Sequence, residues 1–250
     1  MITRRLFLLS SAAVPVACSL NRSATDSVPS AAAVRRPQVG QFWRYAKQDV
    51  FTRAVVQTQV DEVSAVDGSI EISSRTEGDA GANNTQTASK SWWRKYFHHP
   101  QEGRELPGEI QQPWGEVRVD PHWHQVQVYD RPIPLWPAQL QPGWKLRVNT
   151  KYKTSDEEGL SWAQTMRAEA WETIVVPAGQ FKALKYSNLI NFTSSDSGRT
   201  GSVRRETVWL VPEIGRWAAR ESTGTYYHDE SVDDQQLNES GYRWELLSFT

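Results

Sequence analysis

A long alternation of apolar and polar residues constrains the fold more than any other feature of this sequence. In "LSWAQTMRAEAWETIVV", residues 160–176, the apolar side chains fall mainly on even positions, from Leu160 and Trp162 to Met166 and Val176. A repeat of two residues is that of a β-strand with one buried face. We therefore predict one long strand over residues 160–176, in a sheet that faces a core on one side.

Eight other segments are rich in β-branched and aromatic residues and alternate in the same way, and they predict further strands. They are residues 39–47, 54–66, 69–76, 143–152, 181–192, 203–211 and 216–227, with 242–249 closing the chain. Asp67-Gly68 is expected to supply the two positive φ angles of a tight hairpin turn. Residues 177–179 and 212–215 carry turn residues between neighbouring strands.

These strands predict a mainly β fold: a single curved antiparallel sheet, similar to a half-barrel, with little helix. We expect residues 203–211 to pair back on residues 184–192. The glycine spacings also allow a duplicated three-strand unit as an alternative. Residues 77–142 are rich in Gly, Gln and Pro and are expected to form an irregular insertion, with residues 89–99 as its one short helix.

The N-terminal segment "TRRLFLLSSAAVPVAC", residues 3–18, has the layout of an export signal. Arg4 and Arg5 precede a short apolar stretch, and the Phe-Leu that follows resembles a twin-arginine signal; an ordinary secretory leader is the alternative. Val-Ala-Cys at residues 16–18 resembles the end of a lipobox, although Pro15 departs from it. We predict lipidation of Cys18; cleavage after residue 19 without lipidation is the alternative.

The segment after Cys18 fits a lipid anchor. Residues 19–37 are rich in Ser, Ala and Pro without apolar periodicity, which predicts a disordered tether before a single domain over residues 38–250. Several acyl chains on one cysteine give a firm membrane anchor. Ser19 is not the Asp that retains lipoproteins at the inner membrane in enteric-type sorting, which favours the outer membrane, facing the periplasm.

Charge and cysteine content exclude several classes of function. Cleavage before Cys18 removes Arg4 and Arg5, which leaves 26 basic and 29 acidic residues and a net charge of −3. This balance gives no basis for binding nucleic acid. Cys18 is the only cysteine, so its lipidation excludes disulfides, thiolate metal sites and a cysteine nucleophile. We expect no cofactor.

Twelve tryptophans are several times the usual number. Those within predicted strands suit core packing on the concave face of a sheet. Trp92, Trp93, Trp123 and Trp136 lie in the central region near Lys and Arg residues, where exposed rings would suit a ligand or a partner. A segment packed down on the sheet is the alternative for these residues. Trp144 is a further candidate for ligand contact.

No catalytic signature is present. There is no Gly-x-Ser-x-Gly nucleophile elbow and no Gly-rich phosphate loop, and the carboxylate pairs lie in polar turns. His122 and His124, two residues apart, would share one face of a strand and are weak candidates for metal ligands, with Asp120 or the His98-His99 pair as a third ligand. Exposed loop histidines are the alternative.

Three stretches resemble uncharacterised proteobacterial periplasmic lipoproteins: "YDRPIPLWPAQLQPGW" (129–144), "VPAGQFKALKY" (176–186) and "ETVWLVPEIGRWAARE" (206–221). The resemblance covers most of residues 40–249 but rests on short turn motifs. It implies a β-rich half-barrel similar to that of lipoprotein-localisation carriers, and it implies no established activity. The insertion at 78–128 has no counterpart in those proteins.

From the sequence we expect a membrane-anchored envelope lipoprotein that is a binding or structural module. Its partner would be an apolar or amphipathic ligand, or another envelope protein. The alternative is an envelope enzyme that uses the His-, Asp- and Trp-rich residues 92–136, with a metal ion as one option.

Overall fold

The computed structural model describes residues 33–77, 108–123, 125–196, 198–228 and 236–250. Arg4, Arg5, Cys18, the Trp92-Trp93 pair and His124 lie outside these ranges, so the export signal, the lipidation site, the predicted 89–99 helix and the paired-histidine metal site stay predictions. In the described residues, the only helical element is the 3-10 turn η1 (Pro212–Ile214); otherwise the fold is built from antiparallel strands. No described helix is long and apolar enough to span a membrane.

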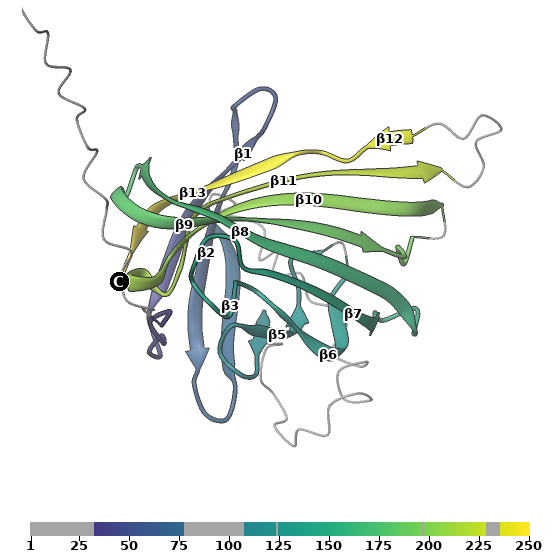
Figure 1. Ribbon diagram of the computed structural model, residues 1–250, viewed down its shortest axis with the longest axis horizontal. Helices are drawn as coiled ribbons and strands as arrows, with labels where there is room; N and C mark the ends of the chain where they lie inside the picture. Colours follow the sequence, from purple (N-terminus) through teal and green to yellow (C-terminus); the bar gives the residue numbers. More distant parts are fainter. Residues whose placement is uncertain (1–32, 78–107, 124, 197, 229–235) are drawn as a thin grey trace, which may run out of the picture.

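Thirteen strands are present in the described residues, and Figure 1 shows their arrangement. They are β1 (Phe42–Asp49), β2 (Val55–Ala65), β3 (Ile70–Glu77), β4 (Glu109–Gln111), β5 (Glu116–Asp120), β6 (Gln127–Pro134), β7 (Lys145–Lys153), β8 (Leu160–Val176), β9 (Gly179–Phe192), β10 (Arg199–Val211), β11 (Arg216–His228), β12 (Gln236–Asn238) and β13 (Tyr242–Phe249).

The sheet closes on itself. Each strand from β1 to β10 pairs with the next one along the chain, and β13 then pairs with both β11 and β1. All strands except β12, which adds to β11, therefore form one closed antiparallel ring. The long strands β8 to β11 run side by side across the molecule, and β1 to β3 cross them steeply (Figure 1). The predicted mainly β antiparallel sheet is confirmed, but the half-barrel is wrong.

The reason for this error lies in residues 77–142, which were expected to be irregular. Their described part contains β4, β5 and β6, which join β3 to β7. Two of these strands are only three and five residues long, and β6 carries Pro132 and Pro134, so no clear alternation marks them. Without these three strands, the predicted sheet is too narrow to close.

The strongly periodic segments form as predicted. β8 spans residues 160–176 and β13 spans residues 242–249, with the predicted bounds. The pairing of β10 back on β9 runs from Leu210↔Leu184 to Ser202↔Phe192. In the β2–β3 turn, only Gly68 has a positive φ, of 68°. The last pair before the turn is Ala65↔Glu71, so the connection is longer than the predicted two-residue turn, which would need two positive φ angles.

The interior of the ring holds two groups of buried apolar residues. One surrounds Trp43 and Trp217, and the other surrounds Trp162, whose ring lies 5.2 Å from that of Trp123. The chain before β1 packs against the same barrel, because the Arg35 amide donates to the Pro212 carbonyl at 2.8 Å. Packing of the chain onto the barrel thus begins before residue 38.

Candidate functional site

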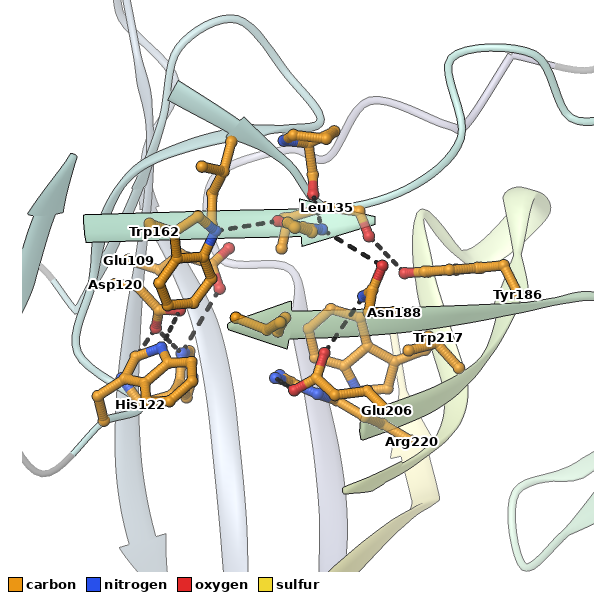
Figure 2. Close-up of a pocket in the computed structure, with 16 residues that line it drawn as sticks. Glu109, Asp120, His122, Leu135, Trp162, Tyr186, Asn188, Glu206, Trp217 and Arg220 are labelled. Carbon is orange, nitrogen blue, oxygen red and sulfur yellow. Dashed lines mark hydrogen bonds and ion pairs between the residues drawn. The ribbon is translucent and has the colours of Figure 1, made fainter. Parts of the chain in front are cut away.

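A network of buried charged side chains lies inside the barrel, between the two apolar groups. Its carboxylates are Asp61 on β2, Glu109 on β4, Asp120 on β5 and Glu206 on β10, and all four are less than 10% exposed. Figure 2 shows three of these carboxylates around a cavity, with His122 beside one group and Arg220 beside the other. Buried charges are stable only where they are paired and hydrogen-bonded, so the partners of each carboxylate define the site.

Arg216, the first residue of β11, is the centre of one half of the network. Its side chain is fully buried, and Nη2 lies 2.9 Å from Asp61 Oδ2 and 3.2 Å from Glu109 Oε2. The guanidinium carbon also lies 4.1 Å from the centre of the Trp217 ring. Burial alone would lower the pKa of Arg216, but the charges of Glu109 and Asp61 outweigh burial and raise the pKa. Arg216 therefore joins β2, β4 and β11 across the interior.

His122 lies next to this group and bridges two carboxylates. Nδ1 is 2.9 Å from Asp120 Oδ1, and Nε2 is 3.4 Å from Ser74 Oγ. Ser74 in turn donates its hydroxyl to Asp61 Oδ1 at 2.7 Å. The Trp123 indole donates to the second oxygen of Asp120 at 2.9 Å, which fixes the orientation of that carboxylate.

The protonation of His122 follows from these contacts. Burial lowers its pKa, but the hydrogen bond and charge of Asp120, together with the charges of Asp61 and Glu109, outweigh burial and raise it. The pKa of Asp120 is lowered to about 2, because its contacts with His122 outweigh the effect of its burial. The raised pKa favours the doubly protonated imidazole, which would donate from Nδ1 to Asp120 and from Nε2 to Ser74 Oγ.

Ser74, His122 and Asp120 have the order of a serine hydrolase triad, but not its proton arrangement. In a triad, a neutral histidine accepts the proton of the serine. Here the serine hydroxyl donates to Asp61 Oδ1, so its hydrogen is directed away from His122. In this geometry the His122 ring does not accept the hydroxyl hydrogen of Ser74.

The other half of the network is centred on Glu206. Arg220 Nη2 lies 2.5 Å from Glu206 Oε1, and the Asn188 amide donates to Oε2 at 3.2 Å. The Gln164 amide donates to Asn188 Oδ1 at 3.3 Å. This line of side chains crosses from β8 through β9 and β10 to β11, and its members Asn188, Glu206 and Arg220 are labelled in Figure 2. It is a structural link between four neighbouring strands.

The cavities that the described residues leave beside the charged network are small. Two neighbouring cavities of about 30 Å³ each share His122, Trp123, Trp217 and Arg220 in their walls. Each has room for about two water molecules. Pockets that enclose a drug-sized ligand are roughly ten times larger. In this structure, the two cavities are suited to water between charged groups and are too small for an acyl chain.

The described candidate tryptophans lie in the interior or at its margin. Trp123 is buried and lines both cavities. Trp136 is buried with its ring edge-on to Trp114, at 4.8 Å between centres. Trp144 is half-buried and packs against the larger apolar group. For Trp123 and Trp136, this is the packed arrangement that the sequence left open as an alternative.

A metal site is not visible in the part of the chain that the structure describes, where no three His, Cys, Asp or Glu side chains form a suitable group. Both nitrogens of His122 are engaged with Asp120 and Ser74. The second histidine of the proposed pair, His124, lies outside the described residues. The metal interpretation of this pair therefore stays a prediction.

Sequence reasoning missed most of the network. Asp61, Glu109, Arg216, Glu206 and Arg220 were not candidates, although some carried a signal. Glu206 is in phase with Val208 and Leu210, which point into the barrel. A charged residue at an inward position of an alternating strand is costly unless it is paired, and this is the pattern that could have identified the site.

Comparison with known proteins gives no family. No protein-family model matches the sequence, and no curated protein matches it. A candidate lipoprotein from Parabacteroides distasonis has a solved structure with a TM-score of 0.44 and 10% identity, covering 88% of this chain and 100% of that chain. A candidate exported protein with a YmcC-like fold from Bacteroides fragilis has a TM-score of 0.44 and 11% identity, covering 88% of this chain and 99% of that chain.

Neither similarity supports transferring a residue role or an activity to this chain. The resemblance to proteobacterial lipoproteins, which rests on short turn motifs, stays a prediction.

Proposed function

We propose that this protein is an envelope lipoprotein, anchored through Cys18, whose closed barrel is a docking module for a protein partner. The anchor is supported by the leader, the lipobox-like residues before Cys18 and the Ser-, Ala- and Pro-rich segment that follows. The barrel is the folded unit that such a tether would hold at the membrane surface.

The interior of the barrel is the observation that carries the docking role. Four carboxylates, two arginines and His122 occupy the space that a carrier would keep free for its ligand. An acyl chain there would break paired charges, and each broken pair costs several kcal/mol, about 3–5 by comparison with other buried pairs. Recognition on the outer surface requires no such loss, so a protein partner fits better than an apolar cargo.

A fluorescent fatty acid tests this choice. Delipidated protein is titrated with the probe, with Trp144→Ala as the comparison because Trp144 is half-buried at the margin of the core. We expect no saturable binding by either protein. Saturable binding at one site in the wild type, weakened in Trp144→Ala, would overturn the docking proposal in favour of a carrier.

The anchor has its own test. Cells that express the full chain are fed radiolabelled palmitate, and the wild type is compared with Cys18→Ser. We expect label on the wild type only, together with release of Cys18→Ser from the membrane fraction. Equal labelling of the two proteins would contradict lipidation at Cys18.

A hydrolase is the second candidate, because Ser74, His122 and Asp120 stand in the order of a catalytic triad. The hydroxyl hydrogen of Ser74 is directed at Asp61, which makes this candidate weaker than docking. Labelling of Ser74 by an active-site probe separates the two functions, as described in the Discussion.

A further inference from the structure

One strand of the barrel, β7, is paired along the whole of one edge but along only part of the other. β7 pairs with β8 from Lys145↔Arg167 to Tyr152↔Leu160. On its other side it pairs with β6 at two positions only, Val128↔Lys153 and Tyr129↔Tyr152. Among the described residues, the edge of β7 that faces away from β8 therefore has no neighbouring strand over residues 145–149.

The sequence of β6 explains why β6 does not pair with the first half of β7. Pro132 and Pro134 have no backbone N–H and cannot donate to a ladder. The end of β6 instead turns toward β5, where Pro134 pairs with Glu116 and the next residue, Leu135, donates its amide to the Gly115 carbonyl at 2.8 Å. The first half of β7 is thus left unpaired by two prolines in its neighbour.

The hydrogen-bond phase of β7 shows which backbone groups face the open side. Just before β7, Ala168 donates its amide to the Trp144 carbonyl at 2.9 Å. In an antiparallel ladder, bonded residues alternate with residues whose groups point away. Leu146 and Val148 are therefore bonded to β8, while the N–H and C=O groups of Lys145, Arg147 and Asn149 point to the open edge.

This edge carries positive charge. Three cations, Lys145, Arg147 and Lys151, are exposed on one face of β7. Arg167, on the neighbouring strand β8, lies directly opposite Lys145. None of these four cations forms an ion pair with another described residue. β7 contains no acidic residue. The opposite face is less polar, with Leu146 37% exposed.

The charge selects the occupant of the edge. Lysines on an edge strand prevent two copies of the same strand from pairing, because like charges directly opposite each other are destabilising. A second copy of β7 is therefore disfavoured. An extended segment with an acidic side chain at every second position would place those side chains opposite Lys145 and Arg147, and small apolar residues between them would face Leu146 and Val148.

We propose that the open edge of β7 over residues 145–149 binds an extended acidic segment of a partner protein as an added β-strand. Backbone hydrogen bonds to Lys145, Arg147 and Asn149 would align the segment, and the basic face would select its charge. This inference rests on the proposed docking function and names the surface and the class of partner.

The test is a titration of the full-length protein, followed by fluorescence anisotropy, with a labelled peptide in which Glu alternates with Val and Thr. One control peptide has the same composition with the Glu residues in one block, and another has Lys in place of Glu. We expect the alternating acidic peptide alone to bind well. Equal binding of the block peptide would show charge attraction without strand addition and would overturn the proposal, as would the absence of binding.

Two variants separate the backbone from the charge. Asn149→Pro keeps every charge and the bonds to β8 but removes one open-edge N–H, so we expect about fivefold weaker binding, since one such hydrogen bond contributes roughly 1 kcal/mol. Lys145→Glu with Arg147→Glu should abolish binding. Arg205→Glu, at an exposed position on β10, is the control for a charge reversal away from this edge and should bind as the wild type does.

Circular dichroism and urea unfolding establish that each variant is folded. Hydrogen exchange gives a second readout, because the amides of Lys145, Arg147 and Asn149 should exchange more slowly when the peptide is bound. Unchanged exchange at these amides, or binding that survives in Asn149→Pro and in the charge reversal, would overturn the edge site. The titration uses neither the anchor nor a natural partner, so its failure would leave the docking function to be judged on its own test.

Discussion

Arg216 Nη2 lies 2.9 Å from Asp61 Oδ2, in an ion pair whose two side chains are excluded from solvent. The residues are 155 positions apart in the chain, so this pair can form only when β2 and β11 are both in the closed ring. Glu109 on β4 completes the group at 3.2 Å from the same nitrogen. Closure of the barrel therefore brings these buried charges together.

Replacing Arg216 by Met should destabilise the protein by about 3–5 kcal/mol, because two buried carboxylates would lose their shared cation. Urea unfolding measures this change. The control is Arg205→Met on the outer surface, where we expect a change within about 0.5 kcal/mol.

Adding Asp61→Asn and Glu109→Gln to Arg216→Met should recover most of the lost stability, because it removes the uncompensated charges. If the triple variant were no more stable than Arg216→Met, the loss would come from packing and the electrostatic explanation would be wrong.

Stability should fall as the pH rises through the pKa of folded His122. This pKa is raised above the usual value of 6.5, so the stabilisation from the His122 charge is complete below 6.5 and is lost as the folded protein releases the proton. Urea unfolding from about pH 6 to about pH 9 should show a decline that His122→Gln removes. A wild type whose stability is flat over this range would contradict a protonated His122.

At low pH the contact between His122 and Asp120 is lost because the carboxylate of Asp120 becomes protonated. The pKa of Asp120 is lowered from 3.8 to about 2, so its contribution is present above 3.8 and disappears as the pH falls through about 2. Acid unfolding of Asp120→Asn should therefore lack a transition component that the wild type has below pH 3.8. The same acid profile in both proteins would exclude this role for Asp120.

A fluorophosphonate probe tests for a nucleophilic serine. We expect no adduct on Ser74, because its hydroxyl donates to Asp61 and not to His122. Ser74→Ala is the control in intact-mass measurement. A stoichiometric adduct that is absent from Ser74→Ala and slow to form in His122→Gln would establish the hydrolase alternative.

Gly115→Ala should destabilise the barrel by about 2–4 kcal/mol through strain and overpacking. Gly115 has a φ of 91°, and an added Cβ would lie 2.8 Å from the Trp136 ring. Gly68→Ala is the matched control, since its φ is also positive but an added Cβ there meets nothing within 4 Å. We expect that variant to lose about 1 kcal/mol. Equal losses measured by thermal unfolding would show that Trp136 does not pack closely on this turn.

The strands with strong alternation could be predicted from the sequence, because local periodicity alone defines β8 and β13. The closure of the ring could not, since it depends on β13 pairing with β1 at the other end of the domain. It also depends on short strands, one of which contains two prolines and so shows no clear alternation. The site was found only in part. The spacing of His122 and His124 suggested a metal, whereas the contacts of His122 come from Asp120, Glu109 and the distant Ser74.

Photo-crosslinking in living cells tests the docking function most directly. A benzoylphenylalanine is placed at Leu146, Val175 or Leu189, which are exposed on three different strands, or at Tyr186, which is buried beside the interior cavity. Docking predicts that at least one outer position gives a discrete crosslink to one envelope protein and that position 186 gives none. A small-molecule mass added at position 186, with no protein crosslink from any outer position, would contradict it.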